Sequence, residues 1–174
     1  MRIISLKPIG KVDRTLLEPL AERLTQCLQV ACSIQPESLD VDFAYNSLRR
    51  QYHSTEILKK LLPKPSNEAW KVLGVTENDL FIPVLTFVFG EAQLADGGAL
   101  VSAHRLHQEY YGMPKDPELL NNRLLKESLH ELGHTYGLRH CLDYTCVMSS
   151  SNGVERIDLK SAEFCPACAR ALAI

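Results

Sequence analysis

Apolar residues recur along this chain with two periods, one typical of helices and one typical of strands. Leucines at helical spacing predict a helix from Asp13, its N-cap, to about Leu28. A short helix is expected to open at Ser54. A longer one begins at Asp116 and ends near Gly137, because an acidic first turn and an early proline favour a helix start at this point.

Short runs of β-branched and aromatic residues, bounded by proline and glycine, predict the strands. The predicted strands span residues 2–9, 30–34, 70–76, 81–89 and 99–103. Pro83 interrupts the fourth run, so we expect its regular part to be 85–89. Strands that alternate with helices indicate an α/β or α+β fold. We expect residues 1–139 to hold the sheet and the long helix, and residues 140–174 to form a small C-terminal subdomain.

Composition limits the classes of function. The chain has 174 residues, of which 45% are hydrophobic, and this is enough to build a core. A formal net charge of −2 argues against a partner such as nucleic acid or an acidic membrane surface. No apolar run is long enough for a membrane helix, and the apolar block near the start is too short for a secretion signal. We therefore expect a soluble, cytoplasmic protein.

The predicted long helix carries the letters HELGH at residues 130–134. Because residues four apart share a helix face, His130 and His134 can direct two imidazoles at one ion. Gly137 can adopt the left-handed conformation that ends a helix, and the chain can then turn to bring in His140 as a third ligand. Three nitrogens with an open fourth position indicate a catalytic zinc site. The competing interpretation is a surface-exposed histidine pair beside an unrelated glycine cap.

Such a site predicts hydrolysis of amide bonds. Zinc lowers the pKa of its bound water from ~15.7 toward ~7 and polarises the scissile carbonyl. Glu131 projects from nearly the same helix face, close to that water, and is expected to take its proton and pass it to the leaving amine. No covalent intermediate is expected.

Cysteine spacing predicts a second metal site. Cys141 and Cys146 are separated by four residues and Cys165 and Cys168 by two, with eighteen residues between the pairs. Two such pairs fit a closed, structural four-thiolate zinc site. A short tail cannot bury a large core, and a structural zinc can supply ~10–16 kcal/mol of folding free energy. Unliganded thiols or a redox-active CxxC pair are the alternatives.

Together these motifs resemble the archaemetzincins, a family in the metzincin clan of zinc peptidases. The shared pattern is HExxHxxGxxH, an immediate cysteine, a second cysteine five residues on, a nearby methionine and a distal CxxC, all within residues 130–168. Residues 70–106 are also similar to the family's substrate-edge region. The resemblance implies a metzincin-like fold: a mixed, mostly parallel five-stranded sheet, backing and active-site helices, and a small zinc-stapled C-terminal subdomain.

The resemblance also implies two zinc ions per chain and a role for each site residue. It assigns the catalytic zinc to His130, His134 and His140. It assigns the structural zinc to Cys141, Cys146, Cys165 and Cys168. Glu131 would be the general base, and Met148 the Met-turn residue under the histidines; from the sequence alone, Met148 is an ordinary core methionine. Residues 87–94 would form the rim strand to which a peptide adds as a further strand.

Other residues have weaker functional interpretations. Serines follow Met148, so the tyrosine that several other metzincin families supply there is missing, and Tyr136 and Tyr144 are expected to be packing or surface residues. The oxyanion donor is therefore unassigned. Glu91 or Asp96 could hold a substrate's α-amine, as an aminopeptidase requires.

The remaining cysteines and two histidines have simpler interpretations. We expect Cys27 and Cys32 to be buried, inert thiols. His104 and His107 are expected to have surface or core roles, with a substrate-side role as the alternative.

Three functions compete on this basis. The first is a zinc metallopeptidase acting on peptides or small proteins, with aminopeptidase activity suggested by the resemblance. The second is a zinc-binding protein of the same fold with little or no proteolysis, and the third is a thiol redox module based on Cys165 and Cys168 alone. Zinc is the expected metal, although three imidazoles also accept iron, cobalt or nickel. A monomer is the expected state.

Overall fold

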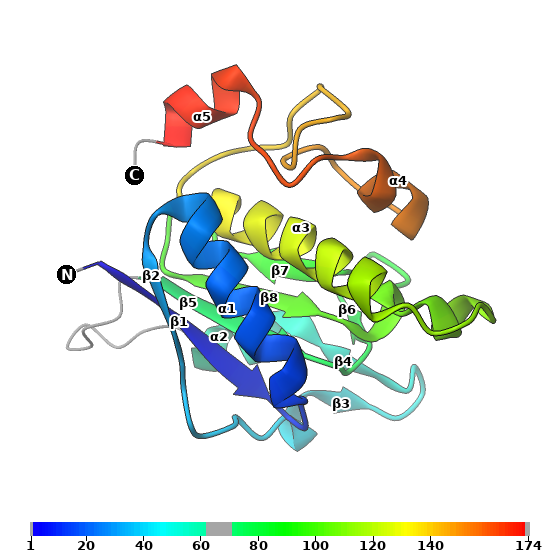
Figure 1. Ribbon diagram of the computed structural model, residues 1–174. Helices are drawn as coiled ribbons and strands as arrows, with labels where there is room; N and C mark the ends of the chain where they lie inside the picture. Colours follow the sequence, from blue (N-terminus) through cyan, green and yellow to red (C-terminus); the bar gives the residue numbers. More distant parts are fainter. Residues whose placement is uncertain (1, 62–70, 173–174) are drawn as a thin grey trace.

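The computed structural model describes residues 2–61 and 71–172. Within this part, the main sheet has five strands in the order β2-β1-β5-β8-β7 (Figure 1). Their bounds are β1 Ile3–Ile9, β2 Ala31–Ile34, β5 Lys71–Thr76, β7 Gly90–Ala92 and β8 Gly98–Ser102. The first four in that order are parallel, and β7 runs antiparallel to β8 at one edge. The expectation of a mixed, mostly parallel five-stranded sheet is confirmed.

Helices cover both faces of this sheet. Helices α1 (Arg14–Leu28) and α3 (Pro117–Thr135) lie on one face, and α2 (Ser54–Leu61) lies on the other (Figure 1). Leucines of α1 and α3 pack against the strands in one buried cluster, and α2 contributes to a second. Every residue of β5 and β8 is buried, because helices cover both sides of these strands.

The predicted helix boundaries are confirmed. Asp13 caps α1 by accepting the N–H of Thr15, and Asp116 caps α3 by accepting the N–H of Leu119, both at 2.9 Å. Gly137 has φ +91°, which is the left-handed conformation expected just after α3.

The predicted strand at 85–89 was wrong. Leu85 instead closes a turn by donating its N–H to the carbonyl of Ile82, and the segment that follows makes a single isolated bridge between Val88 and Leu80. Pro83 has no N–H to contribute to a ladder. The carbonyl of Leu85 accepts a hydrogen bond from the Arg49 side chain at 3.0 Å, so a side chain takes the place of a neighbouring strand.

Several short elements carry too few residues for a periodic pattern, and the sequence did not predict them. A second, small sheet has the order β3-β4-β6, with bounds β3 Tyr45–Asn46, β4 Gln51–His53 and β6 Leu80–Phe81. Single turns of 3-10 helix occupy Asp42–Ala44, His104–Leu106 and Gln108–Tyr111. Trp70, the first residue of a predicted strand, lies outside the described residues.

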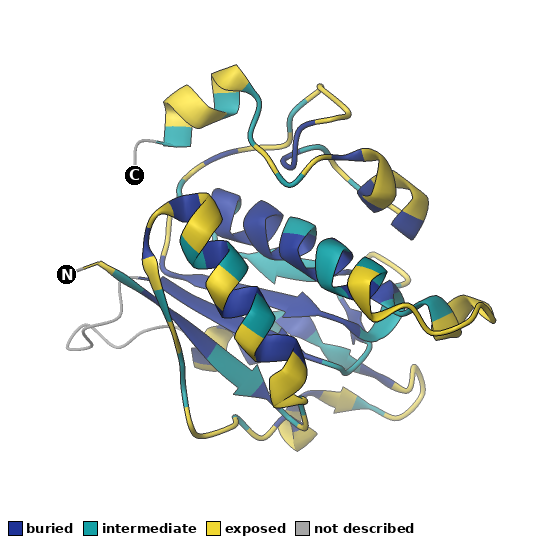
Figure 2. Ribbon diagram, in the orientation of Figure 1, coloured by how far each residue is buried: buried dark blue, intermediate teal, exposed yellow. Residues whose placement is uncertain are grey.

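The C-terminal segment crosses over α3 and contains two short helices, α4 (Val154–Leu159) and α5 (Pro166–Leu172) (Figure 1). Cys146, Val147 and Met148 are buried in the same cluster as the leucines of α3. Figure 2 shows α3 buried along most of its length between this segment and the sheet. The division into residues 1–139 and 140–174 stays a prediction.

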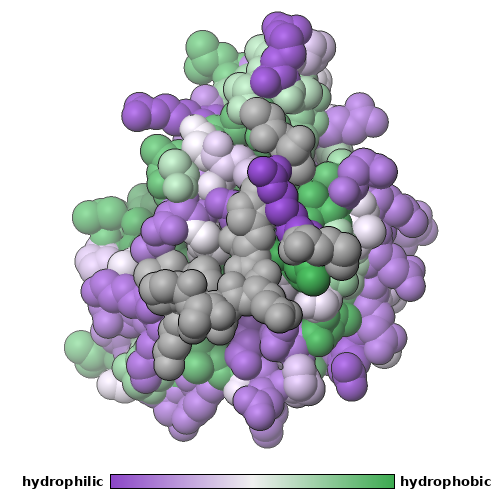
Figure 3. Space-filling model, turned by 90° about the vertical axis from the view of Figure 1, so that its left-hand side faces the viewer, coloured by the Kyte–Doolittle hydropathy of each residue, from purple (hydrophilic) through white to green (hydrophobic). Residues whose placement is uncertain are grey.

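The surface is mixed in character. In the view of Figure 3, hydrophobic residues are scattered among a larger number of hydrophilic ones. Across the described residues, none of the helices combines the length and apolar character needed to cross a membrane.

Candidate active site

The last turns of α3 and the chain reversal after it bring the three histidines together. His130 and His134 lie one turn apart on α3, and the Gly137 N–H donates to the carbonyl of His134 at 2.9 Å as the helix ends. The chain then turns back, and His140 stacks on His130 with 5.2 Å between ring centroids. One ligand atom from each histidine lies within 4.8 Å of the others.

Hydrogen bonds determine which ring nitrogen of His130 and of His134 is available to bind a metal. His130 Nδ1 lies 2.9 Å from the carbonyl of Val147, and His134 Nδ1 lies 2.7 Å from the carbonyl of Leu138. Because a carbonyl can only accept, each Nδ1 carries the proton, and each Nε2 presents a lone pair. The two Nε2 atoms are 3.2 Å apart. Two facing lone pairs repel unless a cation lies between them.

That separation suits zinc. Two nitrogens bound to a tetrahedral zinc at ~2.0–2.1 Å are about 3.3 Å apart. Burial also lowers the pKa of His130 to about 3 and lowers that of His134, so both rings are neutral ligands near pH 7. The residues present therefore fit a zinc ion.

Glu131 is buried beside these ligands. Burial, followed by repulsion from Glu127, raises the pKa of the Glu131 carboxyl well above its ordinary value in the metal-free protein. The Glu131 side chain packs against the backbone of Gly90: a Cβ at Gly90 would lie 2.7 Å from Glu131 Cγ and 2.8 Å from Oε1. The rim strand β7 thus touches the carboxylate directly.

A cleft of about 430 Å³ opens over this group. Its lining includes His130, Glu131, His140, the rim segment 85–90 and the serines and asparagine at 150–152. One wall is the rim segment, and the other belongs to the C-terminal segment. The predicted general base and two of the predicted ligands therefore face one cleft.

Met148 is fully buried against α3. A Cβ at Gly133 would overlap the Met148 sulfur. Because Gly133 has no side chain, the methionine can occupy this space. This position agrees with a Met-turn, and the residue's role stays a prediction.

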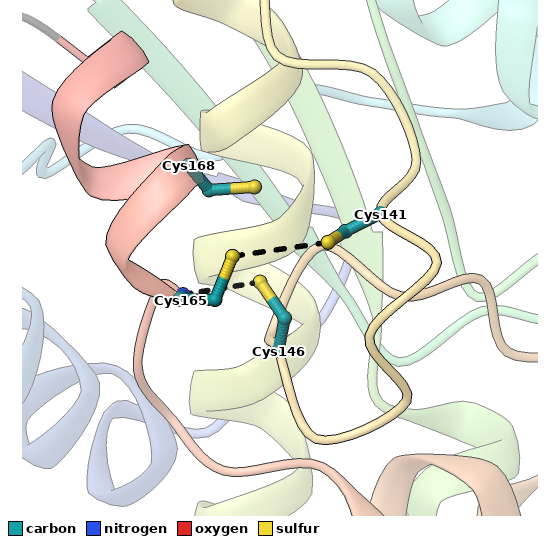
Figure 4. A group of neighbouring side chains, drawn as sticks. All are labelled: Cys141, Cys146, Cys165 and Cys168. Carbon is teal, nitrogen blue, oxygen red and sulfur yellow. Dashed lines mark hydrogen bonds between the residues drawn. The ribbon is translucent and has the colours of Figure 1, made fainter.

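The four predicted cysteines also converge. Their sulfurs lie within 4.8 Å of one another, and the Cys141 and Cys165 sulfurs are 3.8 Å apart (Figure 4). Sulfurs bound to a tetrahedral zinc at ~2.3 Å are also about 3.8 Å apart. The backbone N–H of Cys165 donates to the Cys146 sulfur at 3.3 Å, and the N–H of Cys168 lowers the pKa of Cys165 to about 7. All four are free thiols, so this donor set fits a four-thiolate zinc.

The two other cysteines differ from expectation in part. Cys32 is partly buried, and burial raises the pKa of its thiol. Cys27 is exposed, so its predicted burial was wrong. Cys27 lies on the outer side of α1, because the buried leucines occupy the side of this helix that faces the sheet.

Weaker candidates lie outside the cleft lining. The Glu91 carboxylate accepts hydrogen bonds from Ser54 and Thr55 at the start of α2, and Asp96 Oδ1 accepts the N–H of Gly97 at 2.6 Å. His104 and His107 contact Glu77 instead, the first through its carbonyl and the second through its carboxylate.

Tyr136 is partly buried and Tyr144 is exposed, as expected of packing and surface residues. Sequence reasoning missed Gly90, Glu127 and Lys160. Glu127 could have been found, because it lies three residues before His130 and so on the same helix face.

Comparisons with known proteins agree with this geometry. A family model described as Peptidase family M54 matches residues 39–173. The archaemetzincin of Methanocaldococcus jannaschii is 42% identical over 97% of this chain and 92% of its own length. A crystal structure of a zinc-dependent peptidase from Methanocorpusculum labreanum superposes with a TM-score of 0.87 at 31% identity, covering 97% of this chain and 99% of that one. The archaemetzincin of Archaeoglobus fulgidus, complexed with malonate, gives 0.85 at 38% identity, covering 98% and 99%.

Proposed function

Since the chain belongs to peptidase family M54, the archaemetzincin family of zinc-dependent peptidases, we propose that it hydrolyses peptide bonds in the cleft over α3 with Glu131 as its general base. His130, His134 and His140 hold one zinc ion at this cleft. The four clustered cysteines hold a second zinc, which has no open position and stabilises the fold. The substrate is a peptide or a small protein.

One observation carries this proposal: the His130 and His134 Nε2 atoms face each other at 3.2 Å, while both Nδ1 atoms donate to carbonyls. A zinc ion held there supplies Lewis-acid chemistry, which polarises a carbonyl and makes water more acidic. A surface histidine pair without a metal would have no reason to be held with its lone pairs opposed.

Glu131 supplies the proton transfer. Its carboxylate lies in the cleft, one residue after a ligand, and its buried position favours the protonated form once it has accepted a proton. It takes the proton of the attacking water and returns it to the leaving amine. The rim segment and β7 offer the backbone edge on which a substrate extends.

The finer proposal is aminopeptidase activity. The carboxylates of Glu91 and Asp96 both already accept hydrogen bonds, so a substrate amine would have to compete with these donors. A panel of aminoacyl reporters and N-terminally blocked, internally quenched peptides separates aminopeptidase from endopeptidase activity. An aminopeptidase cleaves the first group and leaves the blocked peptides intact.

The test of the reaction is Glu131→Gln beside the wild type. We expect the variant to keep its zinc content and to lose at least about 100-fold in kcat/KM on peptides, which is the usual contribution of a general base. Glu118→Gln, an exposed change in the first turn of the same helix, is the matched control and should keep full activity. Equal rates for wild type and Glu131→Gln would overturn catalysis by this site, and no peptide hydrolysis by either would favour the second candidate, a zinc-binding protein without proteolysis.

A further inference from the structure

A row of charged contacts joins α3 to the C-terminal segment. Arg123, two turns before His130, holds Asp158 of α4 through two hydrogen bonds of 2.8 and 2.6 Å. One turn further along α3, the Lys126 Nζ donates to the carbonyl of Ile157 at 3.1 Å. The contact in this row that lies nearest the histidines is made by Lys160.

The Lys160 ammonium group is enclosed by three acceptors. Its Nζ lies 2.9 Å from Glu127 Oε1, 2.9 Å from the carbonyl of Ser149 and 3.3 Å from that of Val147. The Lys160 and Glu127 side chains are 1% and 4% exposed. Such a buried ion pair is a poor stabiliser, because well-packed apolar residues of the same volume usually do as well. Its presence beside a functional cleft therefore needs a reason other than stability.

The acceptors supply that reason. The Val147 carbonyl bonded to Lys160 is the same carbonyl that accepts Nδ1–H of His130 at 2.9 Å. Glu127 lies on α3 three residues before His130, so the ammonium group ties the helix that carries the ligand to the carbonyl that aims it. Partners of this kind orient metal-bound histidines and affect metal affinity.

We propose that Lys160 is a positioning residue for the three-histidine zinc site: by binding Glu127 and the Val147 carbonyl together, it fixes the orientation of the His130 ring. The inference rests on the proposed function, because it assumes that the histidines hold zinc. Lys160 acts through Val147 and touches neither substrate nor metal.

The rival explanation is that Lys160 merely fastens the C-terminal segment to α3. The Arg123–Asp158 pair does that in the same row, with two charge-assisted hydrogen bonds, yet it has no bond to a carbonyl that a ligand uses. Asp158→Asn is therefore the matched control, because it weakens the fastening and leaves the Val147 carbonyl alone.

The experiment measures zinc affinity of the full chain by chelator competition, with cobalt(II) absorption to separate histidine from thiolate ligation. We expect Lys160→Met to weaken zinc binding at the histidines by about 10–100-fold, the range seen for such orienting partners, and to leave the four-cysteine zinc unchanged. Because Lys160→Met leaves Glu127 buried without a counter-charge, the double variant Lys160→Met/Glu127→Met removes both charges and is expected to show the same loss.

Each outcome decides something. Wild-type affinity in the double variant overturns the inference, and so does an equal loss in Asp158→Asn. A wild-type chain that holds no zinc at its histidines overturns the proposed function, and the inference with it. If the wild type and the double variant both bind zinc tightly at the histidines, the inference is wrong and the proposed function still stands.

Discussion

Glu131 keeps its place because Gly90 has no side chain. A Cβ at that position would lie 2.6 Å from the carbonyl of Leu100 and 2.8 Å from Glu131 Oε1, both closer than real contacts allow. The Leu100 carbonyl belongs to β8 and cannot move freely, so an added Cβ would shift β7 away from β8 and would also displace the Glu131 carboxylate. We expect Glu131, as the proposed general base, to tolerate little displacement, because an error of about 1 Å in a catalytic group can cost about 100-fold in rate.

Gly90→Ala is therefore expected to lower kcat/KM for peptides by about 100-fold while zinc content stays at the wild-type value. Peptide kinetics and metal analysis of the same preparation measure both quantities. Gly112→Ala is the control for rate: nothing lies within 4 Å of a Cβ there, and although its φ of +73° makes the change cost stability, the folded variant should keep wild-type rates. Unchanged kinetics in Gly90→Ala would show that the close approach to Glu131 does not matter.

The sequence indicated the side chains of the candidate metal site better than the groups packed around them. His130 and His134 were identified because helical spacing alone puts two imidazoles on one face. Gly90 and Lys160 are 40 and 30 residues away from His130 in the chain, and no local pattern links them to it. Their roles depend on which strand edge and which loop pack against α3, and that is decided by tertiary structure.

Among the elements, α3 is held at the end that carries its ligands. The Lys71 Nζ, at the start of β5, donates to the carbonyl of Thr135 at 2.7 Å and to that of Asp96 at 2.9 Å. The Ala95 N–H donates to the carbonyl of His134 at 2.9 Å. Lys71 thus gives a donor to the Thr135 carbonyl in the last helical turn, where carbonyls lack intrahelical partners, and Ala95 gives the His134 carbonyl a second donor beside the Gly137 N–H. Strand β5 and the loop before β8 thereby hold the helix end from which the candidate ligands project.

Lys71→Met should reduce the free energy of unfolding by about 2 kcal/mol, because hydrogen bonds to a charged donor contribute roughly 1.5–3 kcal/mol and the Thr135 carbonyl stays buried. Denaturant titration in excess zinc measures the loss. Lys59→Met removes an exposed lysine that pairs with Glu56, and such pairs contribute about 0–1 kcal/mol. Equal denaturation midpoints for Lys71→Met and the wild type would show that the Lys71 hydrogen bonds do not stabilise the end of α3.

Prediction of the elements succeeded for long helices, in which the apolar spacing repeats many times, and failed for a segment of five residues. The two long helices were identified with their caps, since many leucines share one spacing. Residues 85–89 read as a strand because they are apolar and aromatic, yet Arg49 and a turn at Ile82 hold them as a rim. The same apolar residues serve a cleft wall as well as a strand, so composition could not separate the two.

At the scale of the whole molecule, we expect the stability of the C-terminal segment to depend on a metal ion held by its four cysteines. This segment places Cys146, Val147 and Met148 in the main core, but α5 contributes no buried residue within its described length. Four thiolates on one zinc can supply the missing free energy, since structural zinc contributes about 10–16 kcal/mol in small domains.

Cys165→Ser is expected to reduce zinc from about two ions per chain to about one and to open residues 140–174 to trypsin while the sheet stays resistant. Metal analysis and mass spectrometry of the fragments measure both. Cys27→Ser, an exposed change on α1, should alter neither. Two retained zinc ions and an intact tail in Cys165→Ser would contradict a four-thiolate site, and cleavage elsewhere would contradict the division at residue 140.

His140 and Cys141 are consecutive, so a single peptide unit joins the two clusters. Imidazole ligands would leave a bound zinc dication its full formal charge and make it an electrophile, whereas four thiolates would give the same ion a net charge of −2 and make it inert. Because consecutive α-carbons are about 3.8 Å apart, we expect oxidation that releases the proposed zinc from the sulfurs to shift the His140 imidazole as well. On the proposed function, the activity at the histidines would then depend on the oxidation state of the four cysteines.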